Sequence, residues 1–165
     1  MHLLPGVRVL DVKKFPDERG FFGEAMREDW GDFLGEDKIV QVNVSYSYPG
    51  MIRAWHRHLK GQVDYFMVLQ GAMKICAYDG EEGSPTYGQL DEIIASSERL
   101  QVVRIDGKYW HGTKTVSNDP STTIYAVNRL YDYKDPDEGR RPWNDSGIVD
   151  PKSKTPFDWN KPPHK

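Results

Sequence analysis

The chain has 165 residues, of which 38% are hydrophobic and 28% are charged. This is the length of one domain, and the composition excludes a disordered chain and a membrane-embedded one. The net charge of -3 argues against a general nucleic-acid binder and against adhesion to anionic membranes. We therefore expect a single domain over residues 1–165.

In chain order, short segments with an apolar–polar alternation of period two predominate, which is typical of β-strands. They predict strands over residues 7–12, 41–46, 52–56, 64–70, 72–79, 90–94, 100–105, 112–116 and 122–127. One helix is expected over residues 24–34, with Gly35 as its C-cap. From about residue 134 the composition shifts to proline and charge, which predicts an irregular tail that wraps the domain or reaches a partner subunit. The pattern predicts an all-β barrel or double-sheet jelly roll with a short N-terminal helix.

The cellular location is indicated by the cysteine content and the hydropathy. The single cysteine, Cys76, excludes an internal disulfide and fits a reducing compartment. It lies in an apolar run, where a buried and unreactive thiol is expected. The sequence shows neither a signal peptide nor an apolar stretch of the ~20 residues that a membrane helix needs. We expect a cytoplasmic protein.

Three of the five histidines fall in two clusters at the ends of predicted strands. His56 and His58 are two residues apart, so on a strand they point to the same face. His111 begins a later strand. A lone histidine is more often a satisfied core or surface residue, but this clustering favours a site in which imidazoles converge inside the barrel.

The spacing of these residues resembles that of the cupins. Gly50, His56-x-His58, Asp64 and Gly71 are similar to the first cupin motif, and His111 falls where the second motif has its histidine. The resemblance implies a cupin-type jelly-roll barrel. Many cupins bind a metal, and imidazole with carboxylate suits Mn, Fe, Ni or Zn. A metal-dependent cupin enzyme that uses His56, His58 and His111 is therefore one alternative, and a non-catalytic sugar-binding cupin is another.

A more specific resemblance covers nearly the whole chain. Residues 15–24 (FPDERGFFGE) are similar to the N-terminal signature of the dTDP-4-dehydrorhamnose 3,5-epimerase family. Further motifs of that family follow in its order: Gln41-x-Asn43-x-Ser45, Arg53-x-x-His56, Gly71, residues 84–88, His111-Gly112, Tyr125, Tyr133 and Trp143-Asn144-Asp145. Several motifs in one order are more specific than any one alone.

The resemblance implies an epimerase that acts on a nucleotide-linked 4-keto-6-deoxy hexose, with dTDP as the expected nucleotide. In such a reaction a base removes a proton beside the ketone, and an acid on the opposite face returns one. His56 matches the family's base and Tyr125 its acid. No cofactor is required, in keeping with the absence of a Gly-rich dinucleotide motif.

The resemblance also implies which residues bind the substrate. Guanidinium groups hold diphosphate oxygens through paired hydrogen bonds, and amide side chains match the edge of a pyrimidine. Arg19, Glu24, Gln41, Asn43 and Arg53 match positions that contact the nucleotide in the family, and the other residues expected to bind the substrate are Phe22, His58, Asp64, His111 and Tyr133. In the family the N-terminal strand reaches into a neighbouring subunit, which implies a homodimer here.

Two departures from the family pattern bear on the reaction. Asp64 stands where the family has a lysine that stabilises the enolate, and a carboxylate opposes negative charge there unless it is protonated or metal-bound. The candidates to replace that lysine are Lys60, Lys74, Lys114, His58 and His111. The family's aspartate that orients the base has only Asp150 and Asp158 as candidates. His56-x-His58 followed by Gln62 also resembles the sugar 3,4-ketoisomerases, which is a further alternative.

Overall fold

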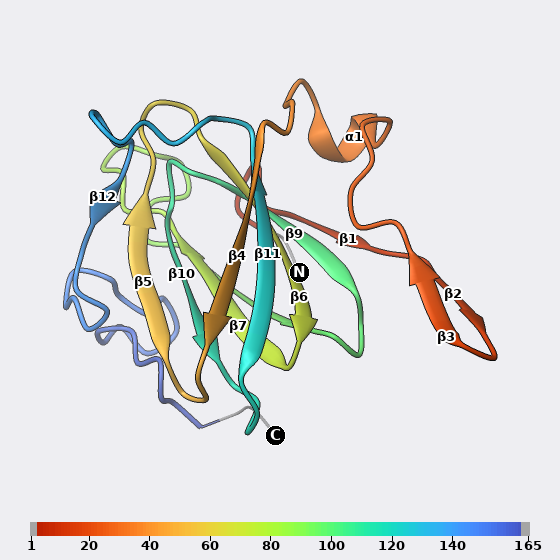
Figure 1. Ribbon diagram of the computed structural model, residues 1–165. Helices are drawn as coiled ribbons and strands as arrows, with labels where there is room; N and C mark the ends of the chain where they lie inside the picture. Colours follow the sequence, from red (N-terminus) through yellow and green to blue (C-terminus); the bar gives the residue numbers. More distant parts are fainter. Residues whose placement is uncertain (1–2, 163–165) are drawn as a thin grey trace.

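A computed structural model describes residues 3–162 of the protein. Two five-stranded antiparallel sheets face each other (Figure 1). The first sheet has, in spatial order, β1 (Arg8–Asp11), β9 (Gln101–Asp106), β6 (Val63–Gln70), β11 (Ser121–Val127) and β4 (Gln41–Ser47). The second has β12 (Gly139–Arg140), β5 (Ile52–Arg57), β10 (Trp110–Thr115), β7 (Ala72–Tyr78) and β8 (Leu90–Ser96). The predicted double-sheet, all-β architecture is confirmed.

All nine predicted strands are present, with ends shifted by at most two residues. Three short strands were not predicted. These are β12 and the hairpin of β2 (Lys14–Asp17) and β3 (Gly20–Gly23). Most residues of β2 and β3 are exposed, so these strands lack the apolar–polar alternation that marks a half-buried strand.

The prediction of a helix over residues 24–34 is wrong for most of its length. The described residues contain one helix, α1 (Gly31–Leu34), of only four residues. The preceding segment is a turn held by Arg27, which pairs with Glu24 at 2.6 Å and with Asp29 at 2.5 Å. The predicted C-cap is correct: Gly35 has a φ of 65°, and its amide donates to the carbonyl of Gly31 at 2.7 Å.

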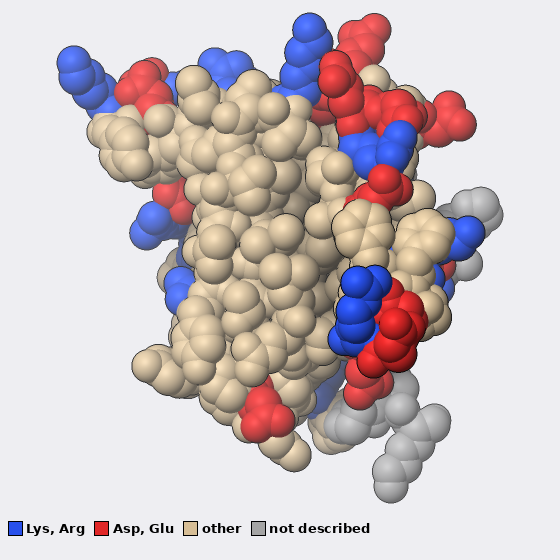
Figure 2. Space-filling model, turned by 45° about the vertical axis from the view of Figure 1, so that its right-hand side comes forward, with Lys and Arg blue, Asp and Glu red and all other residues tan. Residues whose placement is uncertain are grey.

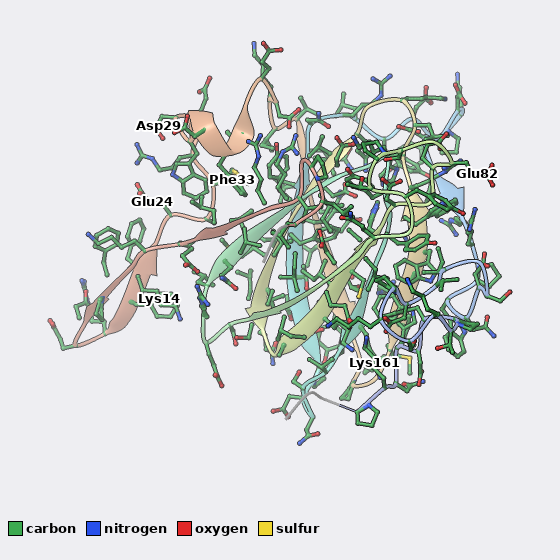
Figure 3. All side chains as sticks on the ribbon, turned by 180° about the vertical axis from the view of Figure 1, so that it is seen from behind. Lys14, Glu24, Asp29, Phe33, Glu82 and Lys161 are labelled. Atoms are coloured by element: carbon green, nitrogen blue, oxygen red, sulfur yellow. The ribbon has the colours of Figure 1, made fainter. Side chains whose placement is uncertain are left out.

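Apolar layers lie between the sheets and on both outer faces. The cluster between the sheets is formed mainly by β6, β7 and β9 and includes Val68, Ile75 and Val103. Outside the first sheet, Phe33 and Leu34 of α1 pack near Tyr65 and Met67 of β6. Figure 3 shows Phe33 pointing from α1 toward the sheets. Outside the second sheet, the chain after β12 supplies Ile148, Phe157 and Trp159, which cover Trp55, Cys76, Tyr78 and Trp110.

The predicted irregular tail therefore wraps the domain as part of its core. Trp159 is 1% exposed, its ring centre lies 4.8 Å from that of Trp55, and its indole N–H donates to the carbonyl of Trp143 at 3.1 Å. Cys76 is fully buried under this layer, and burial raises the pKa of its thiol well above its usual range. The predicted burial of this cysteine is confirmed, and a thiol with a raised pKa in apolar surroundings is expected to be unreactive.

We expect Trp159→Ala to destabilise the fold by about 3–5 kcal/mol, because it leaves a cavity against the outer face of the second sheet. The measurement is urea unfolding followed by tryptophan fluorescence. Trp143→Ala is the matched control, since this indole is 48% exposed and a clearly smaller loss is expected. Equal losses for the two variants would contradict a core role for the tail.

The β2–β3 hairpin projects from the body of the domain as an arm (Figure 1). Its aromatic side chains are exposed: Phe15 by 44%, Phe21 by 54% and Phe22 by 65%. Figure 3 shows Lys14 on the arm and Glu24 in the segment that leads from it to α1. Exposed aromatic groups on a projecting hairpin are typical of a surface that contacts another chain.

No helix among residues 3–162 is both long enough and apolar enough to cross a membrane.

Candidate active site

A cavity of about 360 Å³ lies between the two sheets. Both sheets and the segments around β12 contribute to its wall, so residues far apart in sequence meet there. The polar and aromatic residues that line it are Gln41, Asn43, Ser45, Arg53, His56, His58, Gln62, Asp64, Phe66, His111, Thr113, Thr123, Tyr125, Arg129, Tyr131, Tyr133 and Glu138.

The sheet register brings the histidines together. Strand β10 pairs with β5 so that His111 lies opposite His56, and the two ring centres are 6.4 Å apart. His58 follows the end of β5, and its ring centre is 5.2 Å from that of His111. The prediction that the three imidazoles face one cavity is confirmed by their positions in its wall.

Gly112 permits the close approach of β5 and β10 that this register requires. A Cβ atom on Gly112 would lie 2.9 Å from the Cα atom of Ala54 and 2.9 Å from the carbonyl oxygen of Arg53. Contacts this short do not occur between real side chains and backbone, so the neighbouring strand would have to move. The glycine after His111 therefore serves the packing of the site.

Tyr125 faces the cavity from the opposite sheet. It lies on β11, next to Phe66 of β6, with the two rings stacked at 5.6 Å. Burial raises the pKa of the Tyr125 phenol, and the charges of Asp64 and Glu138 raise it further, so the phenol keeps its proton near neutral pH. On the other side of the cavity, burial lowers the pKa of His56; the neighbouring His111 and Arg140 lower it further, and Glu138 acts in the opposite direction.

Asp64 lies at the centre of a buried polar cluster. Its Oδ2 atom is 3.2 Å from Nε2 of His58 and 3.0 Å from Nε2 of His111. Burial alone would raise the pKa of Asp64, but the hydrogen bonds and charges of the two histidines hold it well below its usual range. Burial opposes the charged form of His58, yet its contact with Asp64 prevails and raises its pKa.

Most predicted site residues lie in the cavity wall. These are His56, Tyr125, Gln41, Asn43, Arg53, His58, Asp64, His111 and Tyr133. Arg19, Phe22 and Glu24 do not line it; they lie on the projecting arm or directly after it. A cavity within one chain thus contains nine of the twelve predicted residues.

The candidates for the carboxylate that orients His56 were wrong. Asp150 pairs with Lys161 at 3.0 Å, and Asp158 caps the amide of Asn160, both outside the cavity. The carboxylate beside His56 is that of Glu138, whose Oε1 atom lies 3.9 Å from Nδ1 of His56. Sequence reasoning missed Glu138 because it lies in the charged, proline-rich segment, where no periodic pattern marks it. Its position follows from the pairing of β12 with β5, which puts Arg140 opposite His56.

The candidate lysines are also elsewhere. Lys60 pairs with Asp135 at 2.6 Å, Lys74 with Glu92 at 3.4 Å, and Lys114 donates to Asn160 at 2.7 Å. Among the described residues, none that lines the cavity is a lysine. Five residues were candidates to replace the lysine of the family. Of these, only His58 and His111 line the cavity.

The residues able to hold a metal ion differ from the predicted set. Ligand atoms of His58, Asp64 and His111 lie within 4.8 Å of one another. His56, which the metal-dependent alternative included, is outside this group, and Asp64 takes its place. The three side chains are all buried.

Comparison with known proteins places this geometry in a family. A sequence profile described as dTDP-4-dehydrorhamnose 3,5-epimerase matches residues 2–150. The chain is 40% identical, over 96% of each chain, to "Probable low-salt glycan biosynthesis epimerase Agl13" of Haloferax volcanii. It is 34% identical to "Spore coat polysaccharide biosynthesis protein SpsL" of Bacillus subtilis, over 96% of this chain and 97% of the relative.

Solved structures agree with the sequence comparisons. The fold is similar to that of dTDP-6-deoxy-D-glucose-3,5-epimerase from Legionella pneumophila, crystallised in complex with dTDP-4-keto-L-rhamnose. The TM-score is 0.77 at 29% identity, over 86% of this chain and 76% of that one. The predicted cupin-type jelly roll and the predicted family are thereby confirmed. The chain belongs to the dTDP-4-dehydrorhamnose 3,5-epimerase family and is an epimerase of that family.

Proposed function

We propose that this epimerase acts on a dTDP-linked 4-keto-6-deoxy hexose and inverts one or both of the carbons that flank the ketone. The proposal is based on the positions of His56 and Tyr125. They come from opposite sheets, β5 and β11, and line the same cavity. A sugar bound between them presents one face to the imidazole and the other to the phenol.

The reaction follows from these two groups. His56 takes the proton from a carbon next to the ketone, and the electron pair of the broken C–H bond moves to the ketone oxygen as an enolate. Tyr125 then gives its phenolic proton to the same carbon from the other face, which inverts the configuration. The tyrosinate and the imidazolium return to their resting forms by proton exchange with water.

Glu138 supports the role of His56. Its carboxylate, 3.9 Å from Nδ1, favours a proton on that nitrogen and leaves Nε2 as the basic atom. The same electrostatic attraction stabilises the imidazolium that forms when the substrate proton is removed. Glu138 is therefore a positioning residue for the base.

We assign the nucleotide portion of the substrate to the part of the cavity wall that contains Arg53, Gln41 and Asn43. The guanidinium of Arg53 donates to Oγ of Ser47 at 2.9 Å and to the carbonyl of Tyr46 at 3.0 Å, which fixes its orientation. On β4, Gln41 and Asn43 point inward, and Gln41 donates to Asn43 at 2.8 Å. Orientated guanidinium and amide groups suit a diphosphate and a pyrimidine base. A second hollow of about 800 Å³ shares Arg129, Tyr131 and Tyr133 with the first and provides room for a nucleotide.

The test is incubation with a panel of dTDP-linked 4-keto-6-deoxy hexoses in heavy water, followed by NMR. Deuterium is expected at the carbon or carbons beside the ketone, together with the inverted product. A product whose carbonyl has moved to carbon 3 would support the 3,4-ketoisomerase alternative. Absence of exchange with every sugar would contradict enolization as the reaction.

We also propose a homodimer in which the arm of one chain completes the cavity of its partner. In such a dimer Arg19, Phe22 and Glu24, which do not line the cavity of their own chain, would contact the substrate in the cavity of the partner. Strand β4 is an edge strand of the first sheet, and its outward side chains Val42 and Val44 are 60% and 73% exposed. Figure 2 shows a broad area without charged side chains on this side of the molecule. An uncharged sheet edge with exposed valines is typical of an interface.

Val44→Asp is expected to raise the dissociation constant of the dimer more than tenfold, because the new carboxylate would lose its hydration at an apolar contact. Sedimentation velocity over a dilution series measures this. Ile94→Asp is the control, because Ile94 is 57% exposed and lies on β8, an edge strand of the other sheet. A wild-type chain that sediments as a monomer at micromolar concentration would contradict the proposed assembly.

A further inference from the structure

We infer that Asp137 is a positioning residue for the reaction, because it fastens the segment that carries Glu138 to the end of β5. The inference rests on the proposed function, in which His56 is the base and Glu138 the carboxylate beside it. The segment concerned is residues 129–138, here called the strap, which leads from β11 of the first sheet to β12 of the second. Figure 1 shows the strap crossing the end of both sheets.

Asp137 lies where the strap becomes buried. Residues 129–136 are all exposed, whereas Asp137 is half-buried. Before this point the amide of Tyr131 donates to a side chain of β4 at 3.1 Å, and Asp135 pairs with Lys60 at 2.6 Å. The side chains of that pair are 77% and 42% exposed, and exposed ion pairs contribute little to stability. The path of the strap toward the cavity therefore depends on the contacts that begin at Asp137.

Asp137 binds the three residues that follow β5. Its Oδ1 atom accepts a hydrogen bond from the amide of Leu59 at 2.7 Å, and its Oδ2 atom accepts one from the amide of Lys60 at 2.8 Å. Its carbonyl oxygen contacts Nδ1 of His58. Hydrogen bonds from backbone amides to a carboxylate are charge-assisted and strong, so both oxygens hold the residue in one orientation.

Glu138 thereby lies between two anchors. After it, β12 pairs with β5, and Arg141 exchanges backbone hydrogen bonds with Trp55 at 3.0 Å in both directions. Before it is Asp137. Without the Asp137 contacts, Glu138 would be at the free end of a two-residue strand, and such ends open at little cost. Its carboxylate would then leave Nδ1 of His56, from which its Oε1 atom is 3.9 Å away, and the attraction would fall with distance.

The chain can tolerate removal of these contacts. Leu59 and Lys60 are both exposed, so water can hydrate the two amides that lose the carboxylate. Asp137→Ala should therefore fold, and its effect on the reaction can be measured. Asp137→Asn is the milder variant, because it keeps one side-chain oxygen that accepts from an amide. It also replaces Asp137→Ala if circular dichroism shows that the alanine variant does not fold.

The test is a double-mutant cycle with Glu138→Gln, read as deuterium exchange beside the substrate ketone. Asp137→Ala is expected to lower kcat about tenfold, as misplacement of a catalytic group does, and to change KM less than about twofold. In the Glu138→Gln background the same substitution should lower kcat less than about twofold, because Asp137 acts through Glu138. Asp137→Asn should lose less than Asp137→Ala. The matched control is Asp135→Ala, an exposed carboxylate of the same strap, which should keep the wild-type kcat.

Two results would overturn the role of Asp137: an unchanged kcat in Asp137→Ala, or an equal loss in both backgrounds, which a merely structural contact produces. The tautomer of His56, read from its ring ¹⁵N shifts at a pH where the ring is neutral, tests the same role without a substrate. Asp137→Ala and Glu138→Gln should each raise the share of rings with the proton on Nε2, and the double variant should raise it no further. If the wild type exchanged with no sugar, the proposed function would fail, while the tautomer would still decide the role of Asp137.

Discussion

Substitution of His56 by glutamine is expected to reduce deuterium exchange beside the substrate ketone by about 10³-fold, in the range that removal of a general base produces. Glutamine retains a polar group of similar reach but accepts no proton. The measurement is the rate of deuterium incorporation in heavy water, followed by NMR with the sugar that the wild-type protein converts. The rate of inversion should fall by the same factor, because exchange and inversion both begin with removal of the proton beside the ketone.

Two further measurements test this prediction more specifically. The affinity of His56→Gln for dTDP should stay close to that of the wild type, since the proposed nucleotide contacts are made by Arg53, Gln41 and Asn43. Glu138→Gln should reduce exchange by a smaller factor, because it removes the charge beside Nδ1 but leaves the base itself. If His56→Gln exchanged at a rate within tenfold of the wild type, another residue of the cavity would have to be the base.

The parts of this site that sequence predicts are those governed by strand periodicity. The two-residue spacing of His56 and His58 predicted that both face one cavity, and the alternation over residues 41–46 predicted the strand that carries Gln41 and Asn43. All four side chains line the cavity; alternation on a strand accounts for Gln41 and Asn43, whereas His58 lies directly after the end of β5. The sheet order then brings β10 beside β5, so that His111 meets His56.

The parts that sequence does not predict depend on segments without periodicity. Glu138 reaches His56 only because β12, a strand of two residues, adds to the edge of the second sheet. Likewise, the helix predicted over residues 24–34 is reduced to four residues, because Arg27 stabilises a turn through its contacts with Glu24 and Asp29. These are tertiary or short-range polar contacts, and hydrophobic patterns do not encode them.

The departure at Asp64 shows how a single position can be interpreted only with its neighbours. In sequence it is a carboxylate at a position where the family resemblance implies a lysine, and a carboxylate there opposes the negative charge of an enolate. In the structure it contacts His58 and His111, so its charge is compensated within a buried cluster. The electrostatic character of the site is therefore set by the cluster of three residues rather than by Asp64 alone.

Tyr125→Phe is expected to separate proton removal from inversion. The variant loses the phenolic proton but keeps the ring that stacks on Phe66 at 5.6 Å, so the cavity should retain its shape. His56 can still form the enolate and return a deuteron from its own face. The expected result is deuterium at the carbon beside the ketone with its configuration retained, while the inverted product falls by about 10²-fold or more.

NMR distinguishes the two outcomes in one sample, because exchange removes the proton signal and inversion changes the couplings of the neighbouring protons. Tyr87→Phe is the matched control: Tyr87 is 54% exposed and does not line the cavity, so both processes should proceed at wild-type rates. If Tyr125→Phe inverted the substrate as fast as the wild type, the acid would have to be another group of the first sheet or the arm of the partner chain. If exchange were lost together with inversion, Tyr125 would be needed for proton removal as well, and the assignment of separate faces to His56 and Tyr125 would fail.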